Sequence, residues 1–300
     1  MRTPCVAAAG ALAVVVWTTE GCQVGAPRPT GEKAVEQTRV TKPQRVASLS
    51  IGTDEILCAL VEPERIVALS KYAPDPEASY VAELARRISV FVERDPERIL
   101  ALRADLVLLA RYTKAELRRA VEQTGTPTLV VEDFRSLADI EGNIRRIGRA
   151  VGEEARAEAV IANMRAKLAQ ARAALRSDRV GLRALYVAPP LVVAGRDTMG
   201  DVKLTAAGLR NAAADAGLTG NATLSAEALL KLDPDVIFVA TGFASDAGFR
   251  ERLLNDTQLA ALSAVRRKRV IALPSRALRT VSHHTADAVL EIVQAVNALP

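Results

Sequence analysis

Short apolar runs that alternate with helical patterns are the feature of this sequence that most constrains its fold. Helical patterns separate the runs: Thr53 is expected to cap the first helix, and Thr113 and Gly125 to begin and end another. Strands that are apolar throughout and alternate with helices are typical of parallel sheets covered on both faces, so the sequence predicts an α/β fold. In the first half, the expected strands are residues 45–50, 65–70, 106–110 and 128–133.

A stretch without strand signals divides this pattern in two. From residue 134 to about residue 176, apolar residues recur at helical spacing, and Gly148 and Gly152 allow a bend, so one long helix or two joined pieces would fit. Alternation then resumes, with strands expected at 181–189, 236–240 and 269–274 and helices at 204–217, 226–234 and 285–299. The prediction is two Rossmann-like lobes with mostly parallel sheets, residues 44–133 and 178–300, joined by a bridging helix over residues 134–177.

One short unit is written twice at a constant offset of 130 residues. Each copy predicts a short helix, a turn and a buried strand, and the two copies stay in register without a gap. Two lobes of the same design explain this duplication better than chance likeness between two helix-turn-strand units. The matching pairs are Glu97 and Glu227, Leu100 and Leu230, Leu102 and Leu232, Asp105 and Asp235, and Ala110 and Ala240.

The first 22 residues predict an export signal. Arg2 is followed by an apolar run over residues 5–17, which is too short for a membrane span and suits a signal-peptide core. Gly21 and Cys22 then offer a lipoprotein cleavage site with Cys22 acylated, and ordinary cleavage is the alternative. Residues 23–43 are polar and contain proline, which indicates a flexible tether. The mature chain is therefore expected outside the cytoplasm, in the periplasm or anchored to the membrane by lipid.

Charge and cysteine content exclude several classes of protein. The net charge of +5 is spread along the chain, and the densest run, residues 266–269, is interpreted as a solvated turn, not a nucleic-acid patch. Cys58 is the only cysteine beyond residue 22 and lies in an apolar helical pattern, so it is expected in the core, without a disulfide or a thiolate zinc site. The only histidines, His283 and His284, are adjacent and do not supply a dedicated zinc or manganese site.

Three stretches, residues 45–76, 95–110 and 225–240, together resemble periplasmic binding proteins of the iron-siderophore, haem and cobalamin class. The likeness covers nearly all of residues 46–299. The resemblance implies two lobes bridged by one long rigid helix, with a ligand held between the lobes and delivered to an ABC permease dimer powered by its ATPase. It also implies a monomer without a cofactor of its own, and small lobe motions on binding.

The ligand is expected in a cleft lined by the loops at the carboxyl ends of the strands. Cations and aromatic side chains gather in these loops, and arginine forks suit carboxylate or catecholate oxygens, which points to an anionic iron chelate. His283 is expected either to face the cleft as an axial ligand or hydrogen-bond donor, or to cap or pack the last helix. The candidate ligand-binding residues are Lys71, Tyr72, Phe91, Arg111, Tyr112, Arg196, Asn221, Arg276, Arg279 and His283.

Departures from the family pattern rank the ligands. Cobalamin binders of this class place Trp in the cleft, whereas the single Trp here, Trp17, lies in the signal region. Haem binders commonly offer a Tyr six residues before the family Glu, where this sequence has Phe91 and Asn221, although Tyr72 or Tyr112 could substitute. A siderophore therefore ranks first, with haem and cobalamin as alternatives.

The resemblance also implies that Glu97 and Glu227 contact the permease, one from each lobe. A carboxylate is favourable near a helix N-terminus, and this alone would explain both residues. An enzyme or a sensor built on the same fold is the rival class. The sequence contains no GxSxG, no P-loop and no GxGxxG after a strand, so no enzymatic activity is expected.

Overall fold

The computed structural model describes residues 42–88, 91–92 and 96–300, and the predicted signal peptide and Cys22 lie outside this part. The N-terminal lobe contains a five-stranded sheet in the order β3-β2-β1-β4-β5, in which every pairing is parallel. Its strands are β1 (Val46–Ser48), β2 (Ile66–Ser70), β3 (Phe91–Val92), β4 (Leu106–Ala110) and β5 (Thr128–Val131). Its helices are α1 (Ile51–Leu60), α2 (Ala82–Ala85), α3 (Pro96–Ala101) and α4 (Ala115–Gln123). The predicted α/β fold is confirmed.

The C-terminal lobe contains a mixed sheet in the order β11-β10-β6-β7-β9, with β8 paired to β6. Strand β7 runs antiparallel to both of its neighbours, whereas β6, β10 and β11 are parallel. The strands are β6 (Arg183–Ala188), β7 (Val192–Ala194), β8 (Arg210–Asn211), β9 (Asn221–Thr223), β10 (Val236–Thr241) and β11 (Val270–Pro274). The helices are α7 (Met199–Ala206), α8 (Ala212–Asp215), α9 (Ala226–Leu232), α10 (Phe249–Asn255), α11 (Ser263–Arg266), α12 (Ser275–Arg279) and α13 (Thr285–Asn297).

Some local predictions were wrong in this part of the chain and at the helix caps. The helix expected over residues 204–217 is instead the end of α7, strand β8 and helix α8, because the chain turns at Gly208, whose φ is +91°. Ser50, not Thr53, is the N-cap of α1, and its side chain accepts a hydrogen bond from the backbone N–H of Thr53. Lys114, not Thr113, is the N-cap residue of α4.

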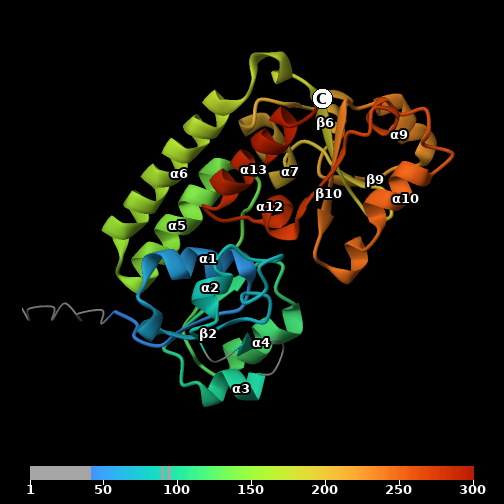
Figure 1. The fold of residues 1–300 in the computed structure, drawn as a ribbon. Helices are drawn as coiled ribbons and strands as arrows, with labels where there is room; N and C mark the ends of the chain where they lie inside the picture. The colour runs from blue at the N-terminus through green and yellow to red at the C-terminus, as the bar shows by residue number, and fades with distance from the viewer. Residues whose placement is uncertain (1–41, 89–90, 93–95) are drawn as a thin grey trace, which may run out of the picture. The chain divides into compact units, whose positions relative to one another are not determined.

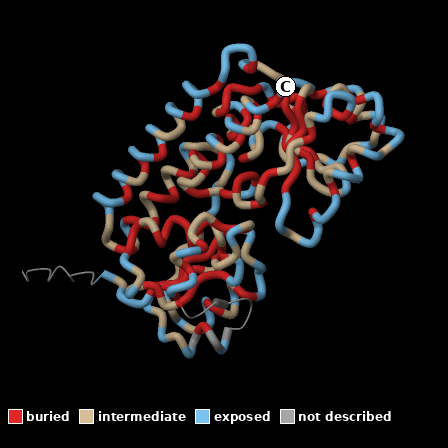
Figure 2. Tube along the Cα trace, viewed as in Figure 1, coloured by how far each residue is buried: buried red, intermediate tan, exposed pale blue. Residues whose placement is uncertain are grey.

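Two helices, α5 (Leu137–Val151) and α6 (Glu154–Ala174), fill the strand-free segment, and Gly152 joins them in a left-handed conformation with φ of 71°. Helix α6 connects the two cores. Ile161 and Met164 pack into the core of the N-terminal lobe, whereas Ala171 packs into that of the C-terminal lobe, and Leu168 contacts both. Figures 1 and 2 show this helix running beside both lobes, with its outer side exposed. Helix α6 therefore acts as the bridge, and α13 packs against it.

The repeated unit makes the same contacts in each lobe. Asp105 accepts a hydrogen bond of 3.0 Å from the backbone N–H of Arg45 beside β1, and Asp235 accepts one of 3.0 Å from Arg183 at the start of β6. Each of these arginines also donates to the carbonyl of the leucine three residues before that aspartate. The turn in each copy uses a left-handed residue, Arg103 or Asp233. The duplicated sequence thus encodes one structural unit, whose aspartate links two neighbouring strands by hydrogen bonds: β1 and β4 in one lobe, and β6 and β10 in the other.

The core predictions also hold. Cys58 is a free, buried thiol in the N-terminal core, and burial raises its pKa. Among the residues that the structure describes, no helix is long and apolar enough to cross a membrane.

Candidate ligand-binding site

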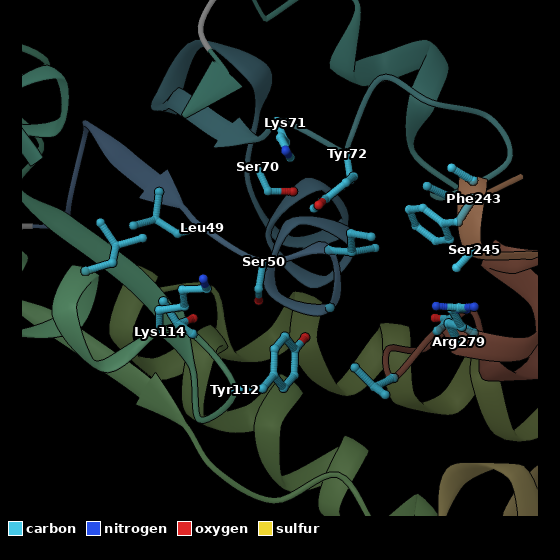
Figure 3. A pocket seen from close by; sticks show the side chains of 18 residues that line it. Leu49, Ser50, Ser70, Lys71, Tyr72, Tyr112, Lys114, Phe243, Ser245 and Arg279 are labelled. Carbon is cyan, nitrogen blue, oxygen red and sulfur yellow. The ribbon is translucent and has the colours of Figure 1, made fainter. Parts of the chain in front are cut away.

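A pocket of about 790 Å³ lies at the carboxyl ends of β1, β2, β4 and β10. Its volume falls within the range of roughly 300–1,000 Å³ that is typical of small-molecule sites. Both lobes contribute to its walls, as Figure 3 shows. The lining residues are Leu49, Ser50, Ile51, Gly52, Ser70, Lys71, Tyr72, Ala78, Tyr112, Thr113, Lys114, Leu117, Phe243, Ala244, Ser245, Arg279, Thr280 and Val281.

Lys71 and Tyr72 follow β2 and form one wall of the pocket. The ammonium group of Lys71 lies 5.0 Å from the centre of the Tyr72 ring, within the range of a cation–π contact. The ring of Tyr72 also meets that of Phe243 edge-on, with a distance of 5.7 Å between the ring centres. Since Phe243 belongs to the other lobe, this aromatic pair connects the two lobes at the edge of the pocket.

Tyr112 stands in the turn after β4 and packs against Phe134, with 5.4 Å between the ring centres. Although 57% of the residue is exposed, its hydroxyl points towards Ser50 at the start of α1 (Figure 3). Burial of this hydroxyl raises the pKa of Tyr112 to about 12, and the hydrogen bond with Ser50 opposes the shift. Tyr112 is therefore a neutral phenol at neutral pH.

Gly52 allows the lobes to approach each other at the floor of the pocket. A Cβ atom on Gly52 would lie 2.6 Å from a methyl group of Val281 and 3.3 Å from the hydroxyl of Tyr112. Both distances are closer than ordinary van der Waals contact, so a side chain here would displace the wall of the pocket.

Arg279 supplies a cation from the C-terminal lobe. Its guanidinium carbon lies 4.9 Å from the centre of the Phe243 ring, and its Nη2 atom donates to the carboxylate of Asp246 at 2.8 Å. The side chain of Arg279 is 40% exposed, whereas that of Asp246 is 1% exposed. Arg279 is thus anchored from behind while part of its surface faces the pocket.

Two buried acids, Asp54 and Glu55, lie in α1, behind the floor of the pocket. Asp54 accepts a hydrogen bond of 2.5 Å from the hydroxyl of Ser70, and burial raises the pKa of Asp54 to about 7. Glu55 accepts hydrogen bonds from Thr280 and Ser282 of the C-terminal lobe. Among the described residues, no group of three or more His, Cys, Asp and Glu side chains could hold a metal ion.

Comparison with known proteins gives this arrangement a family. Residues 46–277 match the model of the family described as periplasmic binding protein. The chain belongs to the periplasmic binding protein family. A periplasmic heme-binding protein, RhuT from Roseiflexus sp. RS-1, is 29% identical with a TM-score of 0.73, over 84% of this chain and 97% of that one. A periplasmic heme-binding protein from Pseudomonas aeruginosa is 25% identical with a TM-score of 0.72, over 86% of this chain and 94% of that one.

A curated relative of this periplasmic binding protein is an uncharacterized ABC transporter substrate-binding lipoprotein, YvrC of Bacillus subtilis. It is 26% identical over 214 residues, which is 69% of this chain and 66%, just under two thirds, of the relative. The family is one of binding proteins, and the name of this relative assigns the relative to substrate binding in transport.

The structure brings together four of the residues that the sequence singled out. Lys71, Tyr72, Tyr112 and Arg279 all line the pocket of this periplasmic binding protein. Arg111 is exposed beside Tyr112 and is not part of the lining. Phe91 begins β3, and its side chain lies outside the described part of the structure.

Two further candidates, Arg196 and Asn221, lie away from the pocket. Arg196 follows β7 and donates to the carbonyl of Ala214, and Asn221 begins β9. Because β7 runs antiparallel to β6, its carboxyl end lies at the opposite edge of the sheet from the pocket, and Asn221 pairs with Ala194 at that end.

Arg276 and His283 lie where the lobes meet, outside the pocket lining. Arg276 donates from Nη1 to the carbonyl of Pro76 at 2.7 Å, and its guanidinium lies over the ring of Tyr80. His283 packs against His284, and burial lowers the pKa of His283 to about 3, so it is neutral at physiological pH. Its position agrees with packing at the start of α13, the second of the two alternatives.

Sequence reasoning did not single out Lys114, Phe243 or Ser245, which also line the pocket of this periplasmic binding protein. Phe243 lies in one of the loops expected to line the cleft, residues 241–244. Ser245 is one residue beyond that loop, and Lys114 is one residue beyond the loop expected over residues 111–113. Extending each expected loop by one residue would have found the two polar side chains.

Proposed function

We propose that this periplasmic binding protein captures an anionic iron chelate in the interlobe pocket and delivers it to an ABC permease. The observation that carries the proposal is the convergence of three cations, Lys71, Lys114 and Arg279, with aromatic rings in one pocket of about 790 Å³. Lysine and arginine head groups complement the carboxylate, catecholate or hydroxamate oxygens of such chelates. The rings of Tyr72 and Phe243 provide apolar surface and, at their faces, a favourable place for cations.

A ferric siderophore is the first candidate. Its iron is already fully coordinated by the chelator, so the protein needs to supply counter-charges and shape, and no ligand to the metal. The lining matches this requirement, because its charged groups are cations and Tyr112 is a neutral phenol.

Haem is the second candidate, and the similarity to two heme-binding proteins at 29% and 25% identity favours it. A protein side chain must then approach the iron, as His, Cys, Met or Tyr do in haem proteins. In the lining, Tyr72 and Tyr112 are the residues of these types, and Lys71, Lys114 or Arg279 would receive the propionates.

Absorption spectroscopy distinguishes these ligands. The mature chain is titrated with a ferric tris-catecholate, a ferric trihydroxamate and haemin, and thermal unfolding is followed at each ligand concentration. A bound siderophore gives a broad visible charge-transfer band and haem gives a Soret band, and either should raise the unfolding temperature. If none of the three binds with a dissociation constant below about 10 μM, a weak affinity for a transport receptor, the iron-chelate proposal is wrong.

Delivery to the permease is assigned to Glu97 and Glu227. Glu97 is exposed in the first turn of α3, and Glu227 is exposed in the first turn of α9, where it pairs with Lys231 at 2.8 Å. These equivalent positions in the two lobes support one contact to each permease subunit.

Acylation of Cys22 is likewise proposed, supported by the lipoprotein relative. Mass spectrometry of the membrane-extracted protein tests it, since an unmodified N-terminus without lipid would contradict it.

A further inference from the structure

Asp246 is a buried acid just behind the pocket wall of the C-terminal lobe. It ends the short helical turn η3 (Ala244–Asp246), two residues of which line the pocket. Its side chain is 1% exposed, and both of its oxygens accept from Nη2 of Arg279 at 2.8 Å. The hydroxyl of Ser275, at the start of α12, lies 3.3 Å from Oδ2. One carboxylate thus connects the segment that carries Phe243 with the helix that carries Arg279.

Arg279 is held on further sides. Its guanidinium lies 4.9 Å from the centre of the Phe243 ring, and it also hydrogen-bonds the hydroxyl of Tyr186 in β6. Since the bond to Asp246 uses Nη2 alone, the guanidinium retains N–H donors for a ligand. A free arginine side chain has considerable rotamer entropy, which a ligand would otherwise have to overcome on binding.

We propose that Asp246 is a positioning residue that acts through Arg279 and sets the preference of the pocket for anionic ligands. The inference rests on the proposed function and deepens it. Asp246 itself does not contact the ligand. It fixes the direction of Arg279, which is the one cation that the C-terminal lobe contributes to the described pocket lining. The opposite reading is that Asp246 mainly neutralises Arg279, in which case its removal would strengthen the binding of anions.

A double-mutant cycle separates these readings. Asp246→Asn, Arg279→Ala and the double variant are titrated with an anionic ferric tris-catecholate and with a neutral ferric trihydroxamate. Each single variant should bind the anionic chelate about tenfold more weakly, as expected for loss of a charge-assisted contact. The double variant should bind no more weakly than Arg279→Ala, and affinity for the neutral chelate should change less than about twofold, because Asp246 acts only through the charge of Arg279.

Asp215→Asn is the matched control. Asp215 also pairs with an arginine of the C-terminal lobe, Arg210 at 2.9 Å, but neither residue lines the pocket. Its affinities should equal those of the unmodified chain. Ser275→Ala leaves the pair of Asp246 and Arg279 intact and removes one hydrogen bond to the carboxylate, so it should show a smaller loss in the same direction.

Three results would overturn the proposal: losses of affinity that multiply in the double variant, equal losses of affinity for both chelates, or an unchanged or tighter affinity of Asp246→Asn for the anionic chelate.

A second measurement needs no ligand. The Nε–Hε NMR signal of Arg279, assigned by its absence in Arg279→Ala, should be sharp in the unmodified chain and broadened in Asp246→Asn. An unchanged signal contradicts the positioning role. Failure of the unmodified chain to bind any chelate contradicts only the proposed function, since the NMR result then decides the role of Asp246.

Discussion

The hydroxyl of Thr280 donates a hydrogen bond of 2.8 Å to the carboxylate of Glu55, although the two residues lie 225 positions apart in the chain and in different lobes. Both residues are buried, and the hydroxyl of Ser282 donates to the same carboxylate oxygen at 2.5 Å. The backbone N–H of Tyr80 donates to the other oxygen at 3.1 Å. The lobes therefore share a fully satisfied polar contact beside the pocket.

Removing this carboxylate should destabilise the folded protein. In Glu55→Ala the hydroxyls of Thr280 and Ser282 lose their common acceptor in a buried place, and we expect the free energy of unfolding to fall by about 1–3 kcal/mol. Urea denaturation measures the change. Glu64→Ala, which removes an exposed carboxylate near β2, is the control and should stay within about 0.5 kcal/mol of the unmodified chain. Equal stability of both variants would show that the interlobe contact contributes little.

The lobes should move little when ligand binds. Helix α6 packs into both cores, and the backbone N–H of Arg276 donates across the interface to the carbonyl of Glu77 at 2.7 Å. A wide opening would have to break these contacts as well as those of Glu55. Small-angle X-ray scattering with and without the ferric chelate should give nearly the same radius of gyration. A large decrease on binding would contradict the rigid bridge.

The two arginines of α12 should have different roles. Arg279 lines the pocket, so Arg279→Ala should weaken binding of an anionic chelate about tenfold. Arg276 instead donates to the carbonyl of Pro76 and lies near Glu291, so Arg276→Ala should lower stability and leave affinity within about twofold. Isothermal titration and thermal unfolding of both variants measure the two effects. A loss of affinity in Arg276→Ala as large as that in Arg279→Ala would contradict this division.

Lys203 should make stability rise with pH in the alkaline range. Burial lowers the pKa of Lys203 from 10.5 to about 7, with Glu55 opposing the shift, and its ammonium donates to the carbonyl of Leu278. Between these two pKa values the unfolded chain binds the proton more tightly than the folded one, so the free energy of unfolding increases as pH rises through this window. Relative to Lys203→Met, the unmodified chain should gain stability between about pH 7 and about pH 10 in urea denaturation. A constant difference between the two proteins over this range would refute the shift.

Charge reversal at the two equivalent acids should separate transport from binding. Glu97→Lys and Glu227→Lys should leave chelate affinity unchanged, because neither residue lines the pocket, and should reduce permease-dependent uptake into reconstituted vesicles. The double variant should transport less than either single variant. Glu122→Lys reverses another exposed acid, at the end of α4, and should transport normally. Normal transport by the double variant would mean that Glu97 and Glu227 serve only their own helices.

Much of the fold was readable from local patterns. Strands such as β4, Leu106–Ala110, are apolar runs whose length and flanking turns identify them, and the absence of such runs after residue 134 predicted the helical bridge. The repeated unit predicted two lobes of one design. In both lobes, the same short helix and left-handed turn are followed by an aspartate that accepts a hydrogen bond from the backbone of the neighbouring strand segment. Loops at the carboxyl ends of strands then gave Lys71, Tyr72, Tyr112 and Arg279 for the pocket.

The tertiary structure decided what local patterns do not encode. The direction of β7 is set by its pairing with β6, and this pairing takes Arg196 and Asn221 to the far edge of the sheet. Likewise, Arg276 and Arg279 are three residues apart on α12, yet one meets the other lobe and the other meets Asp246. Local sequence indicates most helices and strands and shows which residues are apolar. The partner of a polar side chain is fixed only when packing brings distant segments together, because a buried charge must find its counterpart among whatever residues then surround it.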